Sequence, residues 1–419
     1  MSLIKKILNH SFWLLIANSI GRLAMFLTNI LAARVLSQEV FGQFMMIRST
    51  VSMIENIVSG SLGSPMIKRV AEVNHTHDKE LTTIISSLFF INILIVSILV
   101  VFLYLFIPSI VEIFFMGTSS LINGFYIGIF LLIISIFSLM IQNILIGFEE
   151  YKKLAISSFF ASIISIPVIL FLLNNYAFYG ALFGIIFYFT VDFLLKAIQF
   201  NKIFRTTYFP INFEFIIQES KQLLKFSTPL FISILLSSIA FWYARVLLIN
   251  STEDFKSLAI FDAAFQWLTI IMIITGATTS VALPKLSKLI NTSNDLHVKK
   301  VFYINIIINF FIAFTIALVF SYFSKDIMSL YGTSYIDGSI VLQLLAVTSI
   351  FFTISSIFNK YMVAKGKTYN ILFATFLSIL IMFSYLLNNL LDIFHLAISF
   401  CIFYLTLTFV YVVIYWKYK

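Results

Sequence analysis

The sequence predicts an all-α polytopic membrane protein with 12 transmembrane helices, and three observations lead to this fold class. Of the 419 residues, 61% are hydrophobic and only 11% are charged, and the mean hydropathy is +1.03. A soluble domain needs far more polar surface than this. Long apolar segments alternate with short polar breaks, and Lys and Arg gather on alternate breaks. Both patterns are typical of a chain that crosses a bilayer many times.

Each apolar segment contains about 18–27 residues, enough for a helix to cross a hydrocarbon core of about 30 Å. Helices are favoured because open sheet edges cannot face lipid, and no segment shows the alternation of a barrel strand. In order, the predicted spans are 12–34, 40–62, 81–107, 121–147, 154–173, 178–199, 227–249, 257–282, 301–323, 338–362, 371–388 and 394–415.

The distribution of basic residues predicts the orientation. Apart from three arginines inside spans, only Arg34, Lys256 and Lys325 fall on one side of the membrane. The rest of the 27 Lys and Arg residues fall in the opposite loops or at the adjoining span ends. Basic loops remain in the cytoplasm, so both termini are predicted to be cytoplasmic. The net charge of +9 then reflects topology and contact with anionic headgroups, not nucleic acid.

One long polar interruption, residues 201–226, divides the chain into two halves. Its stretch 213–225 has one charged and one apolar face, which predicts an interfacial helix. The organisation expected is an N-terminal six-helix lobe (1–200), a cytoplasmic linker (201–226) and a C-terminal six-helix lobe (227–419). Residues 33–36 and 244–247 both read ARVL and close the first span of each lobe. Because six spans return the chain to its starting side, the lobes would be parallel repeats.

Several motifs resemble a known family. Residues 29–36 (NILAARVL), 40–44 (VFGQF) and 60–65 (GSLGSP) are similar to the start of Wzx-type flippases of bacterial polysaccharide biosynthesis. Pro284 with its basic tail, residues 332–335 (GTSY) and residues 364–366 (AKG) recur at that family's spacing. The resemblance implies two lobes around a central cavity, as in multidrug and toxin extrusion transporters, in a bacterial inner membrane. It also implies a cargo, an undecaprenyl-diphosphate-linked oligosaccharide of O-antigen, lipopolysaccharide or capsule type.

Arginines inside the first two spans are the first candidates for a binding site. A charge near the bilayer centre costs at least about 2.5–3.5 kcal/mol, so it usually faces a cavity or a partner. Arg22 lies near the midplane on a polar stripe with Asn18 and Asn29. It either lines the cavity or forms a structural ion pair or hydrogen bond with a neighbouring helix.

The second span carries the clearest polar stripe, at steps of four, three and four residues: Arg48, Ser52, Glu55 and Ser59. Such spacing places all of these side chains on one helix face. Arg48 and Glu55 either pair with neighbouring helices or line the transport path.

Two further acid–base combinations occur within spans. Arg245 and Asp262 flank a short turn at similar depth, so they form either a salt bridge or, with Gln266 on the same stripe as Asp262, part of the cavity. Asp192 and Lys196 are one helical turn apart, which predicts a local ion pair with a snorkelling lysine. Asp192 alone would be a candidate for proton or sodium coupling.

These charges suit an anionic cargo. Guanidinium groups stay charged and bind phosphate in bidentate fashion, so Arg22, Arg48 and Arg245 are predicted to contact the diphosphate. Glu55, Asp192 and Asp262 are the candidates for ion coupling. The prenyl tail can stay in lipid, and transport would be driven by a proton or sodium gradient or by periplasmic polymerisation of the product.

Two other functions remain open for this sequence. An ion-coupled multidrug exporter would keep the fold but needs acids to dominate the cavity. A membrane-embedded polysaccharide polymerase, the enzyme alternative, usually needs a sizeable outer loop, whereas the outer loops here are short; the polymerase fits better as a partner. No Walker motif is present. No catalytic residue, cofactor or metal site is predicted, and the single cysteine, Cys401, is expected to be a core residue.

Overall fold

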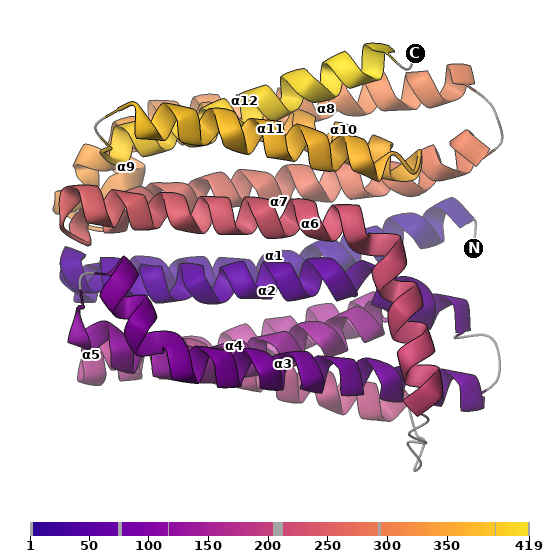
Figure 1. Ribbon diagram of the computed structural model, residues 1–419, viewed down its shortest axis with the longest axis horizontal. Coiled ribbons are helices and arrows are strands. Elements are labelled where there is room, and N and C mark those ends of the chain that lie inside the picture. Colours follow the sequence, from indigo (N-terminus) through magenta and orange to yellow (C-terminus); the bar gives the residue numbers. More distant parts are fainter. Residues whose placement is uncertain are drawn as a thin grey trace. The chain divides into compact units, whose positions relative to one another are not determined.

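A computed structural model describes residues 3–73, 78–115, 117–203, 213–291, 295–389 and 391–417. Within these ranges the side chains of many residues in 3–19, 61–80, 213–227 and 277–301 lie outside the description. The described backbone is helical and contains no strand (Figure 1). Its helices are α1 (Leu3–Val35), α2 (Gln38–Val73), α3 (Asp78–Phe114), α4 (Ser119–Gly147), α5 (Tyr151–Ile203), α6 (Phe213–Thr252), α7 (Lys256–Asn291), α8 (Asp295–Tyr322), α9 (Ser324–Ser329), η1 (Thr333–Gly338), α10 (Ser339–Ala364), α11 (Thr368–Leu387) and α12 (Ile393–Lys417).

The predicted fold class, an all-α polytopic membrane protein, is confirmed. Every predicted span falls on a helix, and α5 accommodates two of them. Within the described residues, nine helices are long and apolar enough to cross a membrane, namely α3 to α8 and α10 to α12. The stretch 213–225 is helical and forms the beginning of α6. Its side chains lie outside the described residues, so its position at the lipid interface stays a prediction.

Helix α5 is two helices that fold back on each other at Ala177. This residue has φ 45° and ψ −115°, a left-handed conformation that is strained for any residue with a side chain. A Cβ atom on Gly180 would lie 1.9 Å from the carbonyl oxygen of Leu172, so glycine allows the two arms to meet immediately after the turn. The sharp reversal brings the polar residues of the second arm against those of the first.

The contacts divide the chain into two compact units. The first comprises residues 1–28 and 46–234, and the second comprises residues 29–45 and 235–419. In the first unit α4 packs against α3 and α5. Its buried face is rich in small residues, among them Gly124, Gly128, Ser135 and Ser138. Small side chains allow close approach of helices in lipid. The lobe boundaries expected from the sequence stay a prediction.

In the second unit α10 is the central helix, packed against α7, α8 and α12, while α11 packs on α12. The turn between α1 and α2 also belongs to this unit. Arg34 Nε donates to the carbonyl oxygen of Leu330 at 2.6 Å, and Gln38 Nε2 donates to that of Ser334 at 2.8 Å. A Cβ atom on Gly42 would lie 1.9 Å from the carbonyl oxygen of Phe255. The motifs around residues 29–44 and 332–335 therefore meet in one packed cluster.

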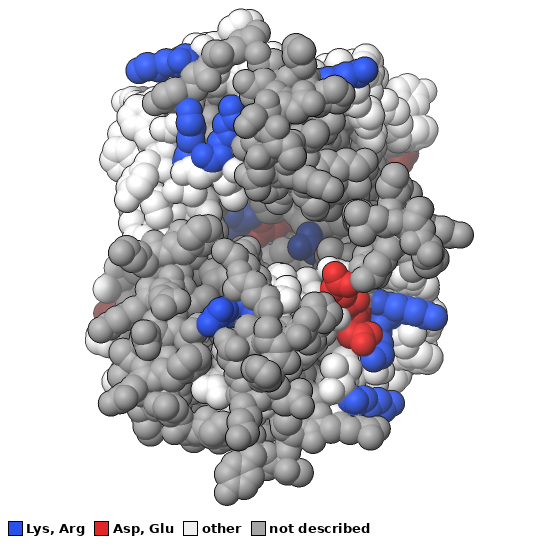
Figure 2. All heavy atoms as spheres, turned by 90° about the vertical axis from the view of Figure 1, so that its right-hand side faces the viewer, with Lys and Arg blue, Asp and Glu red and all other residues white. Residues whose placement is uncertain are grey.

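Basic side chains gather at particular helix ends. On the face shown in Figure 2, Lys and Arg predominate over Asp and Glu among the described residues. In the first unit the described basic residues include Lys152 and Lys153 in the first turn of α5, and in the second unit they include Lys365 and Lys367 at the turn between α10 and α11. The cytoplasmic location of these ends stays a prediction.

Candidate functional site

The arginines of α1 and α2 lie beside the same stretch of α5 in the first unit. The guanidinium carbon of Arg48 lies 5.8 Å from the ring centroid of Phe189. A Cβ atom on Gly21 would lie 2.5 Å from the hydroxyl of Tyr188, so α1 approaches α5 closely next to Arg22. The side chain of Arg22 itself is exposed. The residues of α5 that contact both helices are thus neighbours, which brings the two predicted arginines to one region of this unit.

Arg48 has spare hydrogen-bonding capacity. Its Nη1 atom is buried and has no hydrogen-bond partner among the described residues. A buried donor without a partner costs about 1–3 kcal/mol, more when it is charged. Arg48 therefore gains from any anionic group that reaches it, whereas its stacking on Phe189 holds the guanidinium in place.

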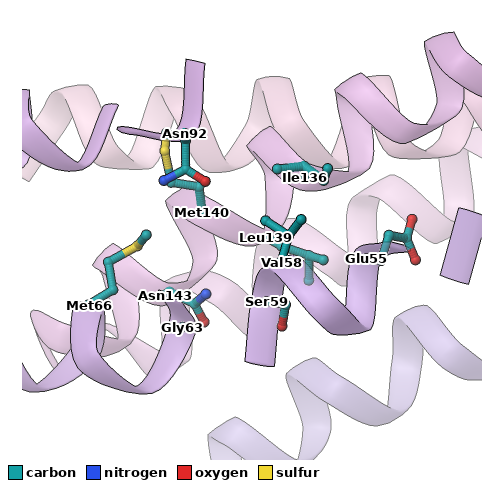
Figure 3. A pocket seen from close by; sticks show the side chains of 10 residues that line it. All are labelled: Glu55, Val58, Ser59, Gly63, Met66, Asn92, Ile136, Leu139, Met140 and Asn143. Atoms are coloured by element: carbon teal, nitrogen blue, oxygen red, sulfur yellow. The ribbon is translucent and has the colours of Figure 1, made fainter. Parts of the chain in front are cut away.

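Glu55 lies on the same face of α2 and borders a small pocket within the first unit (Figure 3). The pocket is lined by Glu55, Val58, Ser59, Gly63, Met66, Asn92, Ile136, Leu139, Met140 and Asn143. In this view Glu55 lies at one end, while Asn92 and Asn143 lie at the other with the methionines. Glu55 Oε1 is buried and lacks a partner among the described residues. The carboxylate and the amides do not point at one another, so they do not form a compact cation site.

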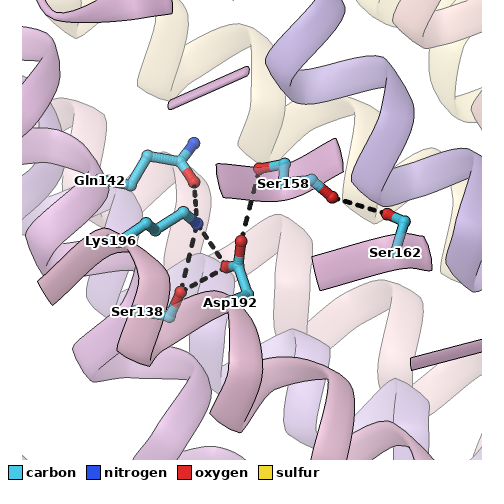
Figure 4. A network of polar contacts seen from close by, with 6 residues as sticks. All are labelled: Ser138, Gln142, Ser158, Ser162, Asp192 and Lys196. Atoms are coloured by element: carbon cyan, nitrogen blue, oxygen red, sulfur yellow. Dashed lines mark hydrogen bonds and ion pairs between the residues drawn. The ribbon is translucent and has the colours of Figure 1, made fainter. Parts of the chain in front are cut away.

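Asp192 lies in a saturated polar network on α4 and α5 (Figure 4). Its Oδ2 accepts from Lys196 Nζ and from Ser138 Oγ at 2.7 Å, and its Oδ1 accepts from Ser158 Oγ at 3.4 Å. Lys196 Nζ also donates to Gln142 Oε1 at 2.8 Å. Asp192 and Lys196 are each 3% exposed. This geometry fits the expected local ion pair, except that the lysine remains buried and does not snorkel.

Arg245 and Asp262 form the second buried pair, in the second unit. Arg245 Nε donates to Asp262 Oδ1 at 3.0 Å, and its Nη1 donates to the carbonyl oxygen of Phe241 at 3.0 Å. The guanidinium carbon lies 4.7 Å from the ring centroid of Phe265 and 5.6 Å from that of Phe400. These contacts favour the salt-bridge interpretation of the pair. The role of Arg245 as a diphosphate ligand stays a prediction.

The pair leaves one carboxylate oxygen free to accept. Asp262 is 2% exposed, and its Oδ2 has no hydrogen-bond partner among the described residues. One turn further along α7, Gln266 Nε2 is also buried without a described partner, while Gln266 Oε1 accepts from Tyr331 at 3.5 Å. Asp262 and Gln266 are thus brought together on α7, as the stripe predicted.

The other predicted cavity residues have different surroundings. Asn29 belongs to the second unit, whereas Arg22 belongs to the first, and Asn29 Oδ1 is buried without a described partner. Ser52 is partly buried. The side chain of Asn18 lies outside the described residues. No cluster of metal-ligating residues occurs in the part of the chain that the structure describes.

Sequence reasoning did not anticipate two features. The first is the set of serines and the glutamine that enclose the Asp192–Lys196 pair, which come from α4 and the first arm of α5. The sequence signal for this polar network was a pair of serines one helical turn apart, at positions 158 and 162. Lys360, near the end of the predicted span 338–362, is partly buried and donates to the carbonyl oxygen of Gly276 at 3.4 Å. A charged residue two positions inside the end of a predicted span was the signal in this case.

Comparison with known families identifies the chain. The model of the polysaccharide biosynthesis protein family matches residues 7–290 of the 419. The protein belongs to the polysaccharide biosynthesis protein family. No curated protein matches it. This family membership agrees with the flippase family that the motifs around residues 29–65 resemble.

Solved structures confirm the fold of this family member. It is similar to an inward-facing multidrug resistance MATE family transporter of the MOP superfamily, with a TM-score of 0.74, 13% identity and 96% of each chain covered. A eukaryotic MATE transporter gives a TM-score of 0.73 at 15% identity, over 98% of this chain and 95% of that one. The third structure is a MOP superfamily transporter from Pyrococcus furiosus, described as having a binding pocket of reverse polarity that suggests a different function. Its TM-score is 0.71 at 16% identity, over 98% of this chain and 93% of that one. The chain therefore shares the fold of these multi-pass membrane proteins.

Proposed function

We propose that the protein is a flippase that moves undecaprenyl-diphosphate-linked oligosaccharide repeat units, of O-antigen or capsule type, from the cytoplasmic to the periplasmic leaflet. The observation that carries this proposal is the match to the polysaccharide biosynthesis family over residues 7–290 on a MATE-like transporter fold. The protein would lie in a bacterial inner membrane with both termini in the cytoplasm, and would deliver its cargo to a polysaccharide polymerase.

The arginines of the first unit support an anionic headgroup as cargo. Arg48 offers a buried Nη1 without a described partner, and Arg22 is exposed beside the same stretch of α5. A diphosphate carries about two negative charges, and guanidinium groups bind phosphate oxygens in pairs. Arg22 and Arg48 are therefore the preferred diphosphate ligands. Arg245 is the weaker candidate because its donors already bind Asp262 and the backbone.

Replacement of Arg48 tests the assignment. We expect Arg48→Ala to lower the flipping rate about 10- to 100-fold, the effect of one or two lost charge-assisted hydrogen bonds. Arg48→Lys keeps the charge but not the bidentate geometry, so it should fall between Ala and the wild type. Arg22→Ala should act in the same direction.

The measurement is made in a strain that lacks the gene and carries each variant at matched protein level. In strains in which flipping is impaired, lipid-linked single repeats should accumulate on the cytoplasmic leaflet, and surface polysaccharide should be lost. Lys325→Ala, an exposed basic residue on α9, serves as the control and should complement fully. Full complementation by Arg22→Ala and Arg48→Ala would remove both from the binding site. Single repeats found unpolymerised on the periplasmic leaflet would overturn the flippase itself.

An ion-coupled multidrug exporter is the second candidate, favoured by the similarity of the fold to MATE family transporters. Unchanged surface polysaccharide in the deletion strain, together with resistance to cationic dyes on overexpression, would establish it. The coupling ion in either case would be a proton or sodium. Asp262 is preferred for this role over Asp192 and Glu55 because its Oδ2 is buried without a described partner and Gln266, one turn further along α7, has a second buried polar atom without one, Nε2.

A further inference from the structure

The turn between α10 and α11 borders a small pocket in the second unit that has no role in the proposed transport. It is lined by Tyr361, Met362, Lys365, Lys367, Ile414 and Tyr415. Two of these side chains carry a positive charge and two end in a hydroxyl group. None of the described residues that line it is acidic, so the pocket has the polarity of an anion site.

The backbone fixes the two lysines on either side of a glycine. Lys367 N donates to the carbonyl oxygen of Met362 at 2.9 Å, and Gly366 N donates to that of Val363 at 3.0 Å. This pair of bonds ends α10 in a Schellman motif, which needs a left-handed residue, and Gly366 supplies it with φ 69°. The positions of the lysine backbones are therefore set by the end of the helix and do not depend on a flexible loop.

Packed aromatic rings form the wall of the pocket. The ring of Tyr415 stacks on Phe302 with 5.2 Å between centroids and lies 5.6 Å from Tyr361. Its hydroxyl lies 3.4 Å from that of Tyr303. Lys365 Nζ lies 5.1 Å from the ring centroid of Tyr361, a cation–π contact that holds the ammonium at the edge of the pocket. A rigid wall and an ammonium held against it reduce the entropy that is lost when a ligand binds.

Electrostatics at the turn favour an added negative charge. Burial and the neighbouring charge of Lys365 lower the pKa of Lys367 below its ordinary value. An anion between the two ammonium groups would relieve this repulsion. Lys367 also precedes the first residue of α11, Thr368, so the positive end of that helix dipole adds in the same direction.

Aromatic residues beside the pocket indicate its depth in the membrane. Trp416 is 62% exposed on α12 next to Tyr415, and Tyr369 is 75% exposed in the first turn of α11. Exposed Trp and Tyr side chains of membrane proteins gather at the level of the lipid headgroups. The pocket therefore opens where lipid phosphates are most concentrated.

We propose that this pocket binds the phosphate group of an anionic membrane phospholipid such as phosphatidylglycerol. Lys365 and Lys367 contact the phosphate oxygens, and the acyl chains remain in the bilayer. Basic pockets between helices bind lipid headgroups in this way at the membrane surface. Two other sources offer the same phosphate chemistry, free inorganic phosphate and a prenyl diphosphate, and the test separates them.

The test uses the full-length protein purified in detergent, and native mass spectrometry counts the retained phosphatidylglycerol. Lys365→Gln/Lys367→Gln should lower the lipid affinity about thirty-fold, since each lysine near the surface contributes about a factor of five. Lys365→Arg/Lys367→Arg keeps both charges and should retain the lipid. Lys256→Gln/Lys325→Gln, which removes the same charge from exposed positions elsewhere in the unit, is the matched control and should also retain it.

Competition identifies the source of the phosphate. The proposal expects phosphatidylglycerol to remain bound when inorganic phosphate or phosphatidylcholine is added in excess. Equal retention by the double glutamine variant and the wild type would overturn the site. Displacement by inorganic phosphate, or preference for a prenyl diphosphate over phosphatidylglycerol, would overturn the assignment to a membrane phospholipid. The flippase proposal is tested separately because the lipid count requires no transport.

Discussion

Among the described residues, each unit contains one buried acid–base pair, and the two pairs differ in how completely their hydrogen-bonding groups are satisfied. Asp192 accepts hydrogen bonds at both oxygens, from Lys196, Ser138 and Ser158. Asp262 accepts from Arg245 at Oδ1 only, and its Oδ2 has no partner among the described residues.

This difference distinguishes a pair that stabilises its unit from a pair that is a candidate for ion coupling. A fully satisfied buried network rigidifies its surroundings and has no vacant position for an exchanging ion. The ammonium of Lys196 already occupies the place among carboxylate, hydroxyl and amide oxygens that a cation would take. At Asp262, by contrast, one oxygen can still accept a proton or contribute to a cation site. We therefore expect the first pair to contribute mainly to stability and the second mainly to coupling.

The largest expected effect is the loss of Lys196. Lys196→Met leaves the Asp192 carboxylate buried without its cation, which should lower the free energy of unfolding by about 3–5 kcal/mol. Denaturant titration of the purified protein in detergent measures this change. The control is Asp192→Leu/Lys196→Met, which removes both charges and should recover most of the loss. A double variant no more stable than the single one would show that the pair is not the scaffold of its unit.

The second prediction concerns Asp262. Asp262→Asn keeps the shape of the side chain, and Arg245 keeps the Phe241 carbonyl and the rings of Phe265 and Phe400. We expect a loss of only about 1–3 kcal/mol in the free energy of unfolding.

Transport by the Asp262→Asn variant should lose its dependence on the proton or sodium gradient, measured in proteoliposomes with imposed gradients. Asp192→Asn is the matched substitution in the other unit. It should cost more stability and leave any remaining transport gradient-dependent. The reverse result would exchange the roles of the two pairs.

Gly42 provides a way to separate packing from chemistry in the second unit. Gly42→Ala places a Cβ atom 1.9 Å from the carbonyl oxygen of Phe255, so α2 must shift. Such overpacking should cost about 1–3 kcal/mol, similar to Asp262→Asn. The gradient dependence of transport should remain unchanged, because no titratable group is altered. If Gly42→Ala and Asp262→Asn lost the gradient dependence of transport equally, the effect of Asp262→Asn would arise from reduced stability and not from the lost carboxylate.

The sequence predicted the spans well because a helix that crosses lipid has few alternatives. All twelve apolar segments became helices, and the reversal at Ala177 separated two of them as expected from the break between 173 and 178. The spacing of Arg48, Ser52 and Glu55 correctly indicated one helix face. Spacing alone gives a face but no neighbour, so the stacking of Arg48 on Phe189 could not be anticipated.

The surroundings of the buried pairs were harder to predict. Partners of Asp192 come from residues 34 and 54 positions away in the chain, and serine is common in membrane spans as a packing residue. The motif around Gly42 was recognised only by resemblance. The structure supplies its physical reason, since the backbone of α2 contacts the turn that precedes α7.

The smallest effect is expected at an exposed acid, Asp392, which serves as a reference for both buried pairs. Its Oδ1 accepts from the backbone N–H of His395 at 2.7 Å and caps α12. Burial raises the pKa of Asp392, but hydrogen bonds from the His395 backbone and side chain outweigh this, and the pKa lies below its usual value of 3.8. Because the pKa is lower in the folded state, the stabilisation is present above the ordinary value and is lost as the pH falls through the folded one.

Asp392→Ala should therefore cost about 0.5–1 kcal/mol near neutral pH. Asp392→Asn keeps a capping oxygen without the charge, so its deficit should be smaller and should vanish in acid as the wild-type carboxylate becomes protonated. Thermal unfolding across pH 3–7 measures both variants. If one of the buried pairs also changed protonation between pH 3 and 7, the wild-type plot of melting temperature against pH would show a second, larger transition. Its disappearance in Asp262→Asn, but not in Asp192→Asn, would locate the titrating group in the second unit.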